Sequence, residues 1–184
     1  VDRILIGGAM AYTFFKSQGR VVGKSLCEDD FLDKAAELLD QAAEIGCQIV
    51  LPVDTVIAKE FKANAENKIA TGDIDEDWQG VDIGPESSRL FAENLADAKT
   101  IVWNGPMGVF ELEPFDKGTR AVAQAVADAT SRGARSVIGG GDSASAIVNM
   151  GLEDKVSHIS TGGGASLEFL EGKQFKCLAI LDEK

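Results

Sequence analysis

The fold is decided by three glycine-rich segments: Trp103-Asn104-Gly105-Pro106-Met107-Gly108-Val109-Phe110-Glu111, Gly139-Gly140-Gly141-Asp142-Ser143 and Ser160-Thr161-Gly162-Gly163-Gly164-Ala165-Ser166. Each segment follows a short apolar run that predicts a buried strand, and each leads toward a stretch typical of a helix. Glycine lets the backbone approach a ligand closely. A loop that leaves a strand and opens into a helix also presents free N–H groups to whatever binds there. Three such loops on one parallel sheet predict a phosphate- or nucleotide-binding site.

Apolar runs and helical periodicity alternate along most of the chain. We expect strands at residues 3–6, 48–51, 53–58, 100–103, 136–138 and 156–160, and helices at residues 9–18, 28–45, 85–95, 117–130, 143–150 and 165–170. Residues 59–84 are polar, acidic and irregular, so we expect a loop-rich excursion there with a short strand at residues 68–70. The alternation predicts an α/β fold: a Rossmann-like parallel sheet with helices on both faces, in three αβα layers. Ligands of such sheets bind at the carboxyl ends of the strands, where the glycine-rich segments lie.

Length and charge restrict the class of partner. The chain has 184 residues, enough for one domain with its own core, and its formal net charge is -12. Nucleic acid is not expected as a partner, because its phosphates need a basic surface. An anionic ligand must therefore be held by backbone N–H groups, helix dipoles and a metal cation.

The longest apolar stretch and the cysteines indicate the cellular compartment in which we expect the protein. The longest apolar stretch, residues 4–15, is too short to span a bilayer, so we expect no membrane partner. Cys27, Cys47 and Cys177 are scattered and lack CxxC spacing, which argues against a disulfide framework or a zinc site. We therefore expect a cytoplasmic protein. A monomer is expected as well.

Two glycine patterns match nucleotide-binding motifs in part. Gly19-Arg20-Val21-Val22-Gly23-Lys24-Ser25 has three residues between its glycines where a P-loop has four, and it follows a helix, so we interpret it as a connector between helices. Gly139-x-Gly141-x-x-Ala144 matches the dinucleotide fingerprint, but no acidic residue for a ribose follows the next strand. A dinucleotide-dependent oxidoreductase domain stays open as an alternative.

Asp142 points to a metal rather than to a bare phosphate. Magnesium takes one or two carboxylates and fills its remaining positions with water and phosphate oxygens. Asp142 can hold such an ion while the hydroxyl and N–H groups at Ser143 hold the phosphate; the alternative is that Asp142 only caps the helix that follows. Asn104, directly after a strand, can present its amide to a phosphate or can simply form a turn.

Three further positions each allow a functional and a structural interpretation. Glu111 can accept hydrogen bonds from ribose hydroxyls, or it can be a solvated loop charge. Gly162, Gly163 and Gly164 can direct a helix N-terminus at a transferring phosphate, or they can serve tight strand–helix packing. His158, the only histidine, is expected in mid-strand. We interpret it as structural, because a general base stands at the ligand end of a strand.

Taken together, these segments resemble the phosphoglycerate kinase family, and the similarity covers essentially all 184 residues in order. The matching stretches are residues 102–111, residues 138–143, residues 155–168, Leu51-Pro52-Val53-Asp54 and Gly80-x-Asp82-Ile83-Gly84-Pro85. The resemblance implies the carboxyl-terminal, nucleotide-binding domain of an enzyme that reversibly transfers a phosphoryl group between 1,3-bisphosphoglycerate and ADP with Mg2+.

The resemblance also implies a role for each loop at the strand ends. It places Gly7 and Gly8 on one wall of the adenosine pocket, and Gly80 and Val81 on the other. Asn104 and Pro106 would lie beside the nucleotide, and Glu111 at the ribose hydroxyls. The phosphates and magnesium would be held by Gly140, Gly141, Asp142 and Ser143, with Asp142 on the metal, and the transferring phosphate would be covered by Gly162, Gly163 and Gly164. Ala9 departs from the family, which often has a third glycine there; its methyl group is expected to narrow the pocket slightly.

Half of the family's machinery is not in this sequence. The family binds 3-phosphoglycerate or 1,3-bisphosphoglycerate on a basic amino-terminal domain, and no such domain is present, nor is the family's upstream glycine-rich segment with its phosphate-binding lysines. The chain begins at Val1 without a methionine, so we expect it to be part of a longer protein. We expect weak ADP or ATP binding and almost no turnover, because the family works by domain closure. A non-catalytic nucleotide-binding module is the second alternative.

Overall fold

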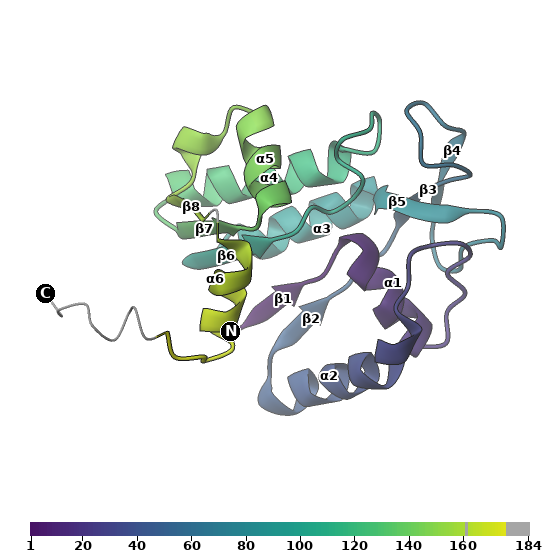
Figure 1. Ribbon diagram of the computed structural model, residues 1–184, viewed down its shortest axis with the longest axis horizontal. Coiled ribbons are helices and arrows are strands. Elements are labelled where there is room, and N and C mark those ends of the chain that lie inside the picture. Colours follow the sequence, from purple (N-terminus) through teal and green to yellow (C-terminus); the bar gives the residue numbers. More distant parts are fainter. Residues whose placement is uncertain (161, 176–184) are drawn as a thin grey trace, which may run out of the picture.

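One parallel sheet carries the three glycine-rich segments. In the computed structural model, which describes residues 1–160 and 162–175, β6 (Thr100–Asn104), β7 (Arg135–Gly139) and β8 (His158–Ser160) pair in that order (Figure 1). The register sets Asn104 beside Gly139 and Gly139 beside Ser160, so all three segments leave the same edge of the sheet. The predicted common edge is confirmed. Thr161 and Cys177 lie outside the described residues.

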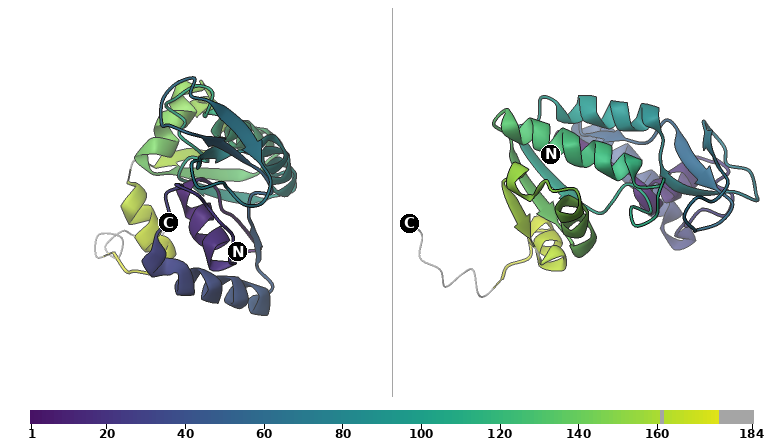
Figure 2. Two further views of the ribbon diagram at one scale, coloured as in Figure 1. Left: turned by 90° about the vertical axis from the view of Figure 1, so that its right-hand side faces the viewer. Right: turned by 90° about the horizontal axis from the view of Figure 1, so that it is seen from above.

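Helices cover both faces of the parallel strands. β1 (Arg3–Leu5) pairs in parallel with β2 (Gln48–Val50). The apolar side chains of this pair and of β6 share one core with α3 (Pro85–Leu95) and α4 (Lys117–Ser131), which lie side by side (Figure 2). Members of this core are Leu5, Val50, Phe91, Leu95, Ile101, Trp103, Val122, Val126 and Ile138.

The other face is covered by different helices. α1 (Gly8–Ser17) and α2 (Leu32–Ile45) form a second core with Ile49 of β2. α6 (Gly163–Leu170) lines an apolar cavity of about 480 Å³ with Val102 and Val137, which point away from the α3–α4 face because side chains alternate along a strand. α5 (Gly141–Asn149) follows β7. The three-layer αβα fold is confirmed.

Residues 55–83 depart from the expected alternation of strand and helix. β3 (Thr55–Ala58), β4 (Asn67–Ala70) and β5 (Gln79–Ile83) form an antiparallel sheet in the order β4-β3-β5. The short strand near residue 68 is confirmed, but β5 was expected to be loop. Its sequence contains Gly80 and Asp82, which disfavour strands locally, and yet both are buried, so tertiary contacts override the local preference.

The remaining connections are short. Residues 19–25 link α1 to η1 (Asp29–Phe31) and α2, as expected for a connector, and the Ser25 hydroxyl accepts a hydrogen bond from the Gly80 amide at 2.8 Å. α2 ends at Gly46, which has φ 73°. η2 (Glu153–Lys155) precedes β8, and His158 opens that strand as an exposed residue rather than lying in its middle. Within residues 1–160 and 162–175, no helix has the length and apolarity that a bilayer crossing needs.

A buried carboxylate from a distant segment holds the beginning of α3. Asp54 accepts hydrogen bonds from the Glu86 amide at 3.1 Å, the Ser87 amide at 2.7 Å and the Ser87 hydroxyl at 2.6 Å. These amides belong to the first turn of the helix, where no intrahelical acceptor exists. A Cβ atom at Gly84 would overlap the Asp54 carboxylate, so the contact depends on glycine there.

Replacing Asp54 should therefore destabilise the fold strongly. Asp54→Ala removes the charged acceptor of both amides and leaves the Ser87 amide buried without it, and we expect the free energy of unfolding to fall by about 3 kcal/mol. Urea denaturation monitored by circular dichroism measures this. Asp33→Ala, at an exposed aspartate in the first turn of α2, is the control. Equal losses in the two variants would contradict the assignment.

Candidate active site

A cavity of about 320 Å³ opens beside the carboxyl end of β6, and it brings together four residues expected at a nucleotide. Gly8 comes from α1, Gly80 and Val81 from β5, and Pro106 from the segment after β6. Most of the lining is apolar; its members are Gly8, Ala9, Tyr12, Leu26, Phe61, Gly80, Val81, Pro106, Met107, Gly108 and Val109. The volume and the apolar lining suit an apolar ring system.

At two glycines in the walls of this cavity, neighbouring groups pack directly on the backbone. A Cβ atom at Gly80 would overlap the Tyr12 ring, so the ring packs directly on the β5 backbone. Gly8 has φ 62°, and a Cβ atom there would lie 2.9 Å from the Pro106 carbonyl oxygen. The Gly8 amide donates to the Met107 carbonyl at 3.1 Å. This first-turn amide of α1 is therefore engaged by the cavity wall and is not free for an anion.

A second groove continues from the cavity along β6. It has a volume of about 550 Å³, and Gly7 and Asn104 line it together with Gly8, Ala9 and Pro106, which also line the cavity. Leu167 and Leu170 of α6 close its far side. A ligand that fills the cavity can therefore extend to Asn104, whose side chain lies against Gly140 at the beginning of α5.

Two helices begin at the carboxyl edge of the β6–β7–β8 sheet. α5 begins after Gly140, which has φ 86°, and α6 begins after Gly162. The first amides of a helix lack intrahelical acceptors and carry the positive end of its dipole. Gly141 lies at the first helical position of α5, and Gly163 and Gly164 lie in the first turn of α6; their expected contact with phosphate stays a prediction.

Asp142 lies in the first turn of α5 with its side chain exposed. No side-chain hydrogen bond caps this helix, so the interpretation of Asp142 as a helix cap is wrong. Among the described residues, no group of three or more His, Cys, Asp or Glu side chains is arranged to hold a metal ion. A single exposed carboxylate beside free amides fits a Mg2+ that arrives with phosphate oxygens as its other ligands.

Ser143 and Glu111 differ in solvent exposure. Glu111 is exposed, in the segment between β6 and α4. Ser143 is fully buried, and its hydroxyl accepts a hydrogen bond from the Gly105 amide at 2.7 Å. Its expected contact with phosphate stays a prediction; what the structure shows is a contact with a second loop.

Asp82 lies beneath the cavity wall as a buried carboxylate. It accepts hydrogen bonds from the Gly118 amide at 2.7 Å and the Ile83 amide at 2.9 Å. Burial raises the pKa of Asp82 to about 7; the two amides lower it and the nearby Asp116 raises it. The same burial, with the Asp82 charge as a smaller cause, raises the pKa of the Tyr12 phenol.

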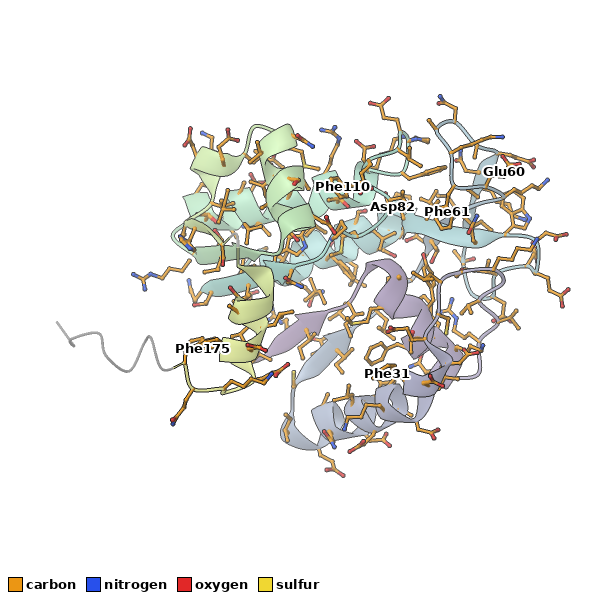
Figure 3. The ribbon with its side chains drawn as sticks, viewed as in Figure 1. Phe31, Glu60, Phe61, Asp82, Phe110 and Phe175 are labelled. Carbon is orange, nitrogen blue, oxygen red and sulfur yellow. The ribbon has the colours of Figure 1, made fainter. Side chains whose placement is uncertain are left out.

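Several lining residues carried no signal in the sequence. Figure 3 shows Phe61 on the segment between β3 and β4, and Phe61 lines the cavity together with Gly80 and Val81 of β5. Leu26 arrives from the connector after α1, and Tyr12 from the buried face of α1. A periodic pattern shows that an apolar residue is buried, but not that it borders a cavity. Their position at the cavity becomes evident only from the three-dimensional structure.

Comparison with known proteins identifies the family. A family model described as phosphoglycerate kinase matches residues 1–173. The chain belongs to the phosphoglycerate kinase family. Phosphoglycerate kinase of Chloroherpeton thalassium is 59% identical over 182 residues, which cover 98% of this chain and 46% of the relative. That of Thermosipho africanus is 59% identical over 186 residues, covering 100% of this chain and 46% of the relative.

Solved structures of the family have the same fold. Phosphoglycerate kinase from Coxiella burnetii superposes with a TM-score of 0.90 at 47% identity, over 94% of this chain and 44% of that one. The enzyme from Pyrococcus horikoshii OT3 gives a TM-score of 0.81 at 33% identity, over 97% of this chain and 44% of that one. The chain thus spans less than half the length of these relatives. Membership of a kinase family argues against the oxidoreductase alternative.

The Asp82 carboxylate predicts a distinctive pH dependence of stability. The ordinary pKa of aspartate is 3.8, so between about pH 4 and pH 7 the unfolded chain loses this proton while the folded chain keeps it. The contribution of Asp82 to stability is largest below pH 4, falls by about 1.4 kcal/mol for each pH unit in that window, and is constant above it.

Comparison with Asp82→Asn isolates this contribution, because the other titrating groups are the same in both proteins. We expect the unfolding free energy of the original chain, minus that of the variant, to decrease from pH 4 to pH 7. Urea titrations at four pH values in this range measure it. A difference that stays constant or rises with pH would show that the Asp82 pKa is not raised.

Proposed function

We propose that this chain is the nucleotide-binding, carboxyl-terminal half of a phosphoglycerate kinase. It would bind ADP or ATP with Mg2+, while 3-phosphoglycerate or 1,3-bisphosphoglycerate would be held by another half of the protein. The observation that carries this proposal is the apolar cavity walled by Gly8 and Gly80, continuous with a groove that reaches Asn104, whose side chain lies against Gly140 at the beginning of α5. A nucleotide has the same arrangement: an apolar ring, a ribose and an anionic tail.

The cavity supports the adenosine end of the proposal. Val81, Val109 and Phe61 supply apolar contact for a base, and the glycine backbones let the ring lie close to the main chain. Pro106 and Asn104 border the way out toward the phosphates. Glu111, exposed beyond them, has the acceptor oxygens that ribose hydroxyls require.

The helix N-termini support the phosphate end. With a net charge of -12 the chain has few cations to spare, so amides of Gly140, Gly141 and the α6 turn would have to hold the phosphate oxygens. Asp142 would hold Mg2+, which supplies positive charge beside those oxygens when it is bound. Gly162, Gly163 and Gly164 would face the group being transferred and stabilise its charge.

The proposed reaction is a direct phosphoryl transfer. The bond between the acyl oxygen of 1,3-bisphosphoglycerate and its phosphorus breaks, a bond from an ADP β-phosphate oxygen to that phosphorus forms, and 3-phosphoglycerate and ATP result. Such transfers depend on positioning and charge stabilisation more than on covalent chemistry by the protein. The amides of this chain would perform the second task, and the other half of the protein would complete the first.

Nucleotide binding is tested with MgADP and Asp142→Ala. We expect isothermal titration calorimetry to detect MgADP binding by the 184-residue chain and the variant to bind about tenfold more weakly, because a charge-assisted link to Mg2+ is lost. EDTA should remove most of this difference. Asp154→Ala, at an exposed aspartate before β8, is the control and should bind normally. Undetectable binding by the original chain would overturn the proposal.

Turnover is tested separately. In a coupled assay with 3-phosphoglycerate and MgATP, we expect the 184-residue chain to be slower by several orders of magnitude than a complete phosphoglycerate kinase. Holding two reactants in register accounts for a large part of such an enzyme's rate, and this chain would hold one of them. Rates comparable to the complete enzyme would show that the second substrate site lies within these residues. A longer protein that contains this chain but is inactive would favour the non-catalytic binding module.

A further inference from the structure

We infer that Ser143 is a positioning residue, whose buried hydroxyl fixes the 104–106 loop so that the two ends of the nucleotide site are joined before a nucleotide binds. The inference rests on the proposed function, since it assigns a task to Ser143 at that same site. It differs from the expected role, in which this hydroxyl itself holds phosphate.

The Gly105 residue is held on both sides. Its amide donates to the Ser143 hydroxyl at 2.7 Å, and its carbonyl oxygen accepts from the Trp103 indole nitrogen, also at 2.7 Å. Ser143 is fully buried, Trp103 is 6% exposed and Gly105 is partly buried, so both bonds are partly shielded from water. Gly105 has φ 97°, a conformation that few other residues adopt. A loop that would otherwise be free to pivot is thus fixed at its middle residue.

Asn104 makes a second contact between the same two loops. A Cβ atom at Gly140 would lie 2.9 Å from the Asn104 side-chain oxygen, and one at Gly139 would lie 3.4 Å from it. The Asn104 amide therefore rests on the backbone at the turn from β7 into α5. Gly140 has φ 86°, so side chains are disfavoured there for two independent reasons.

These contacts connect the cavity to the anion site. Pro106 follows Gly105 directly and lines the adenosine cavity, while Asp142 precedes Ser143 directly and stands exposed at the beginning of α5. The hydrogen bond from Gly105 to Ser143 therefore joins the segment that lines the cavity to the beginning of α5. A site that is already arranged loses less conformational entropy on binding, and its affinity is correspondingly higher.

The Ser143 hydroxyl could also stabilise the fold without affecting nucleotide affinity. A second buried serine in the chain serves as a matched control for this alternative. Ser136, near the other end of β7, is equally buried, and its hydroxyl also accepts from a backbone amide, that of Ser157 at 2.9 Å. Ser136→Ala and Ser143→Ala each remove a buried hydroxyl that accepts a hydrogen bond from one backbone amide. A general loss of stability should therefore be similar in both, whereas an effect on nucleotide affinity should be confined to Ser143.

The experiment is calorimetric titration of MgADP into the 184-residue chain and three variants. We expect Ser143→Ala to bind about tenfold more weakly, Ser143→Thr to restore affinity because it keeps the hydroxyl, and Ser136→Ala to bind as the original chain does. As a measurement that needs no variant, the Gly105 amide should exchange slowly with deuterium in NMR spectra recorded without nucleotide, because the bond to Ser143 protects it.

The outcomes separate this inference from the proposed function. Equal affinities of Ser143→Ala and Ser136→Ala, or rapid exchange of the Gly105 amide, would overturn the positioning role while leaving nucleotide binding intact. Absence of MgADP binding by the original chain would overturn the proposed function, and the positioning role with it.

Discussion

This structure depends on close contacts between side chains and the glycines of neighbouring segments. In each contact the side chain occupies the space where a Cβ atom of another residue would lie. The Asp82 carboxylate would overlap a Cβ atom at either Gly108 or Gly118, and it binds the amide of Gly118 at the beginning of α4. The Tyr12 ring has the same relation to Gly80. Each contact joins elements far apart in the chain, and three of these, α1, β5 and the segment at Gly108, are walls of the cavity. The glycines near the site thus shape the protein itself as well as leaving room for a ligand.

The sequence predicted the parallel part of the fold well, because apolar periodicity there reports burial on a sheet covered on both faces. α3 begins and ends where its Pro85 and apolar spacing predict, and the three glycine-rich segments reach one edge. β5 could not be predicted, since its character comes from partners distant in sequence. A glycine beneath a tyrosine ring and an aspartate between backbone amides look like loop residues until those partners are in place.

The candidate site divides in the same way. Gly8, Gly80, Val81 and Pro106 meet at one cavity, as the family resemblance implied, whereas Phe61 and Leu26 needed the three-dimensional structure. Ser143 shows a different limit. Its position after a glycine-rich strand end indicates a phosphate site, but the direction of its hydroxyl depends on a loop about forty residues earlier in the chain, and no local pattern encodes that.

The two ends of the site differ in how complete they are. The cavity is bounded by α1, β5 and the segment after β6, and its walls are fastened by buried hydrogen bonds and glycine contacts. The helix N-termini of α5 and α6, in contrast, face outward with Asp142 exposed beside them. An exposed carboxylate repels a bare phosphate and attracts it only through a cation, so under the proposed function this end would gain affinity when metal and phosphate arrive together. The base would then be held in a cavity whose walls are already fastened, and the phosphates would remain accessible to a second reactant at the open end.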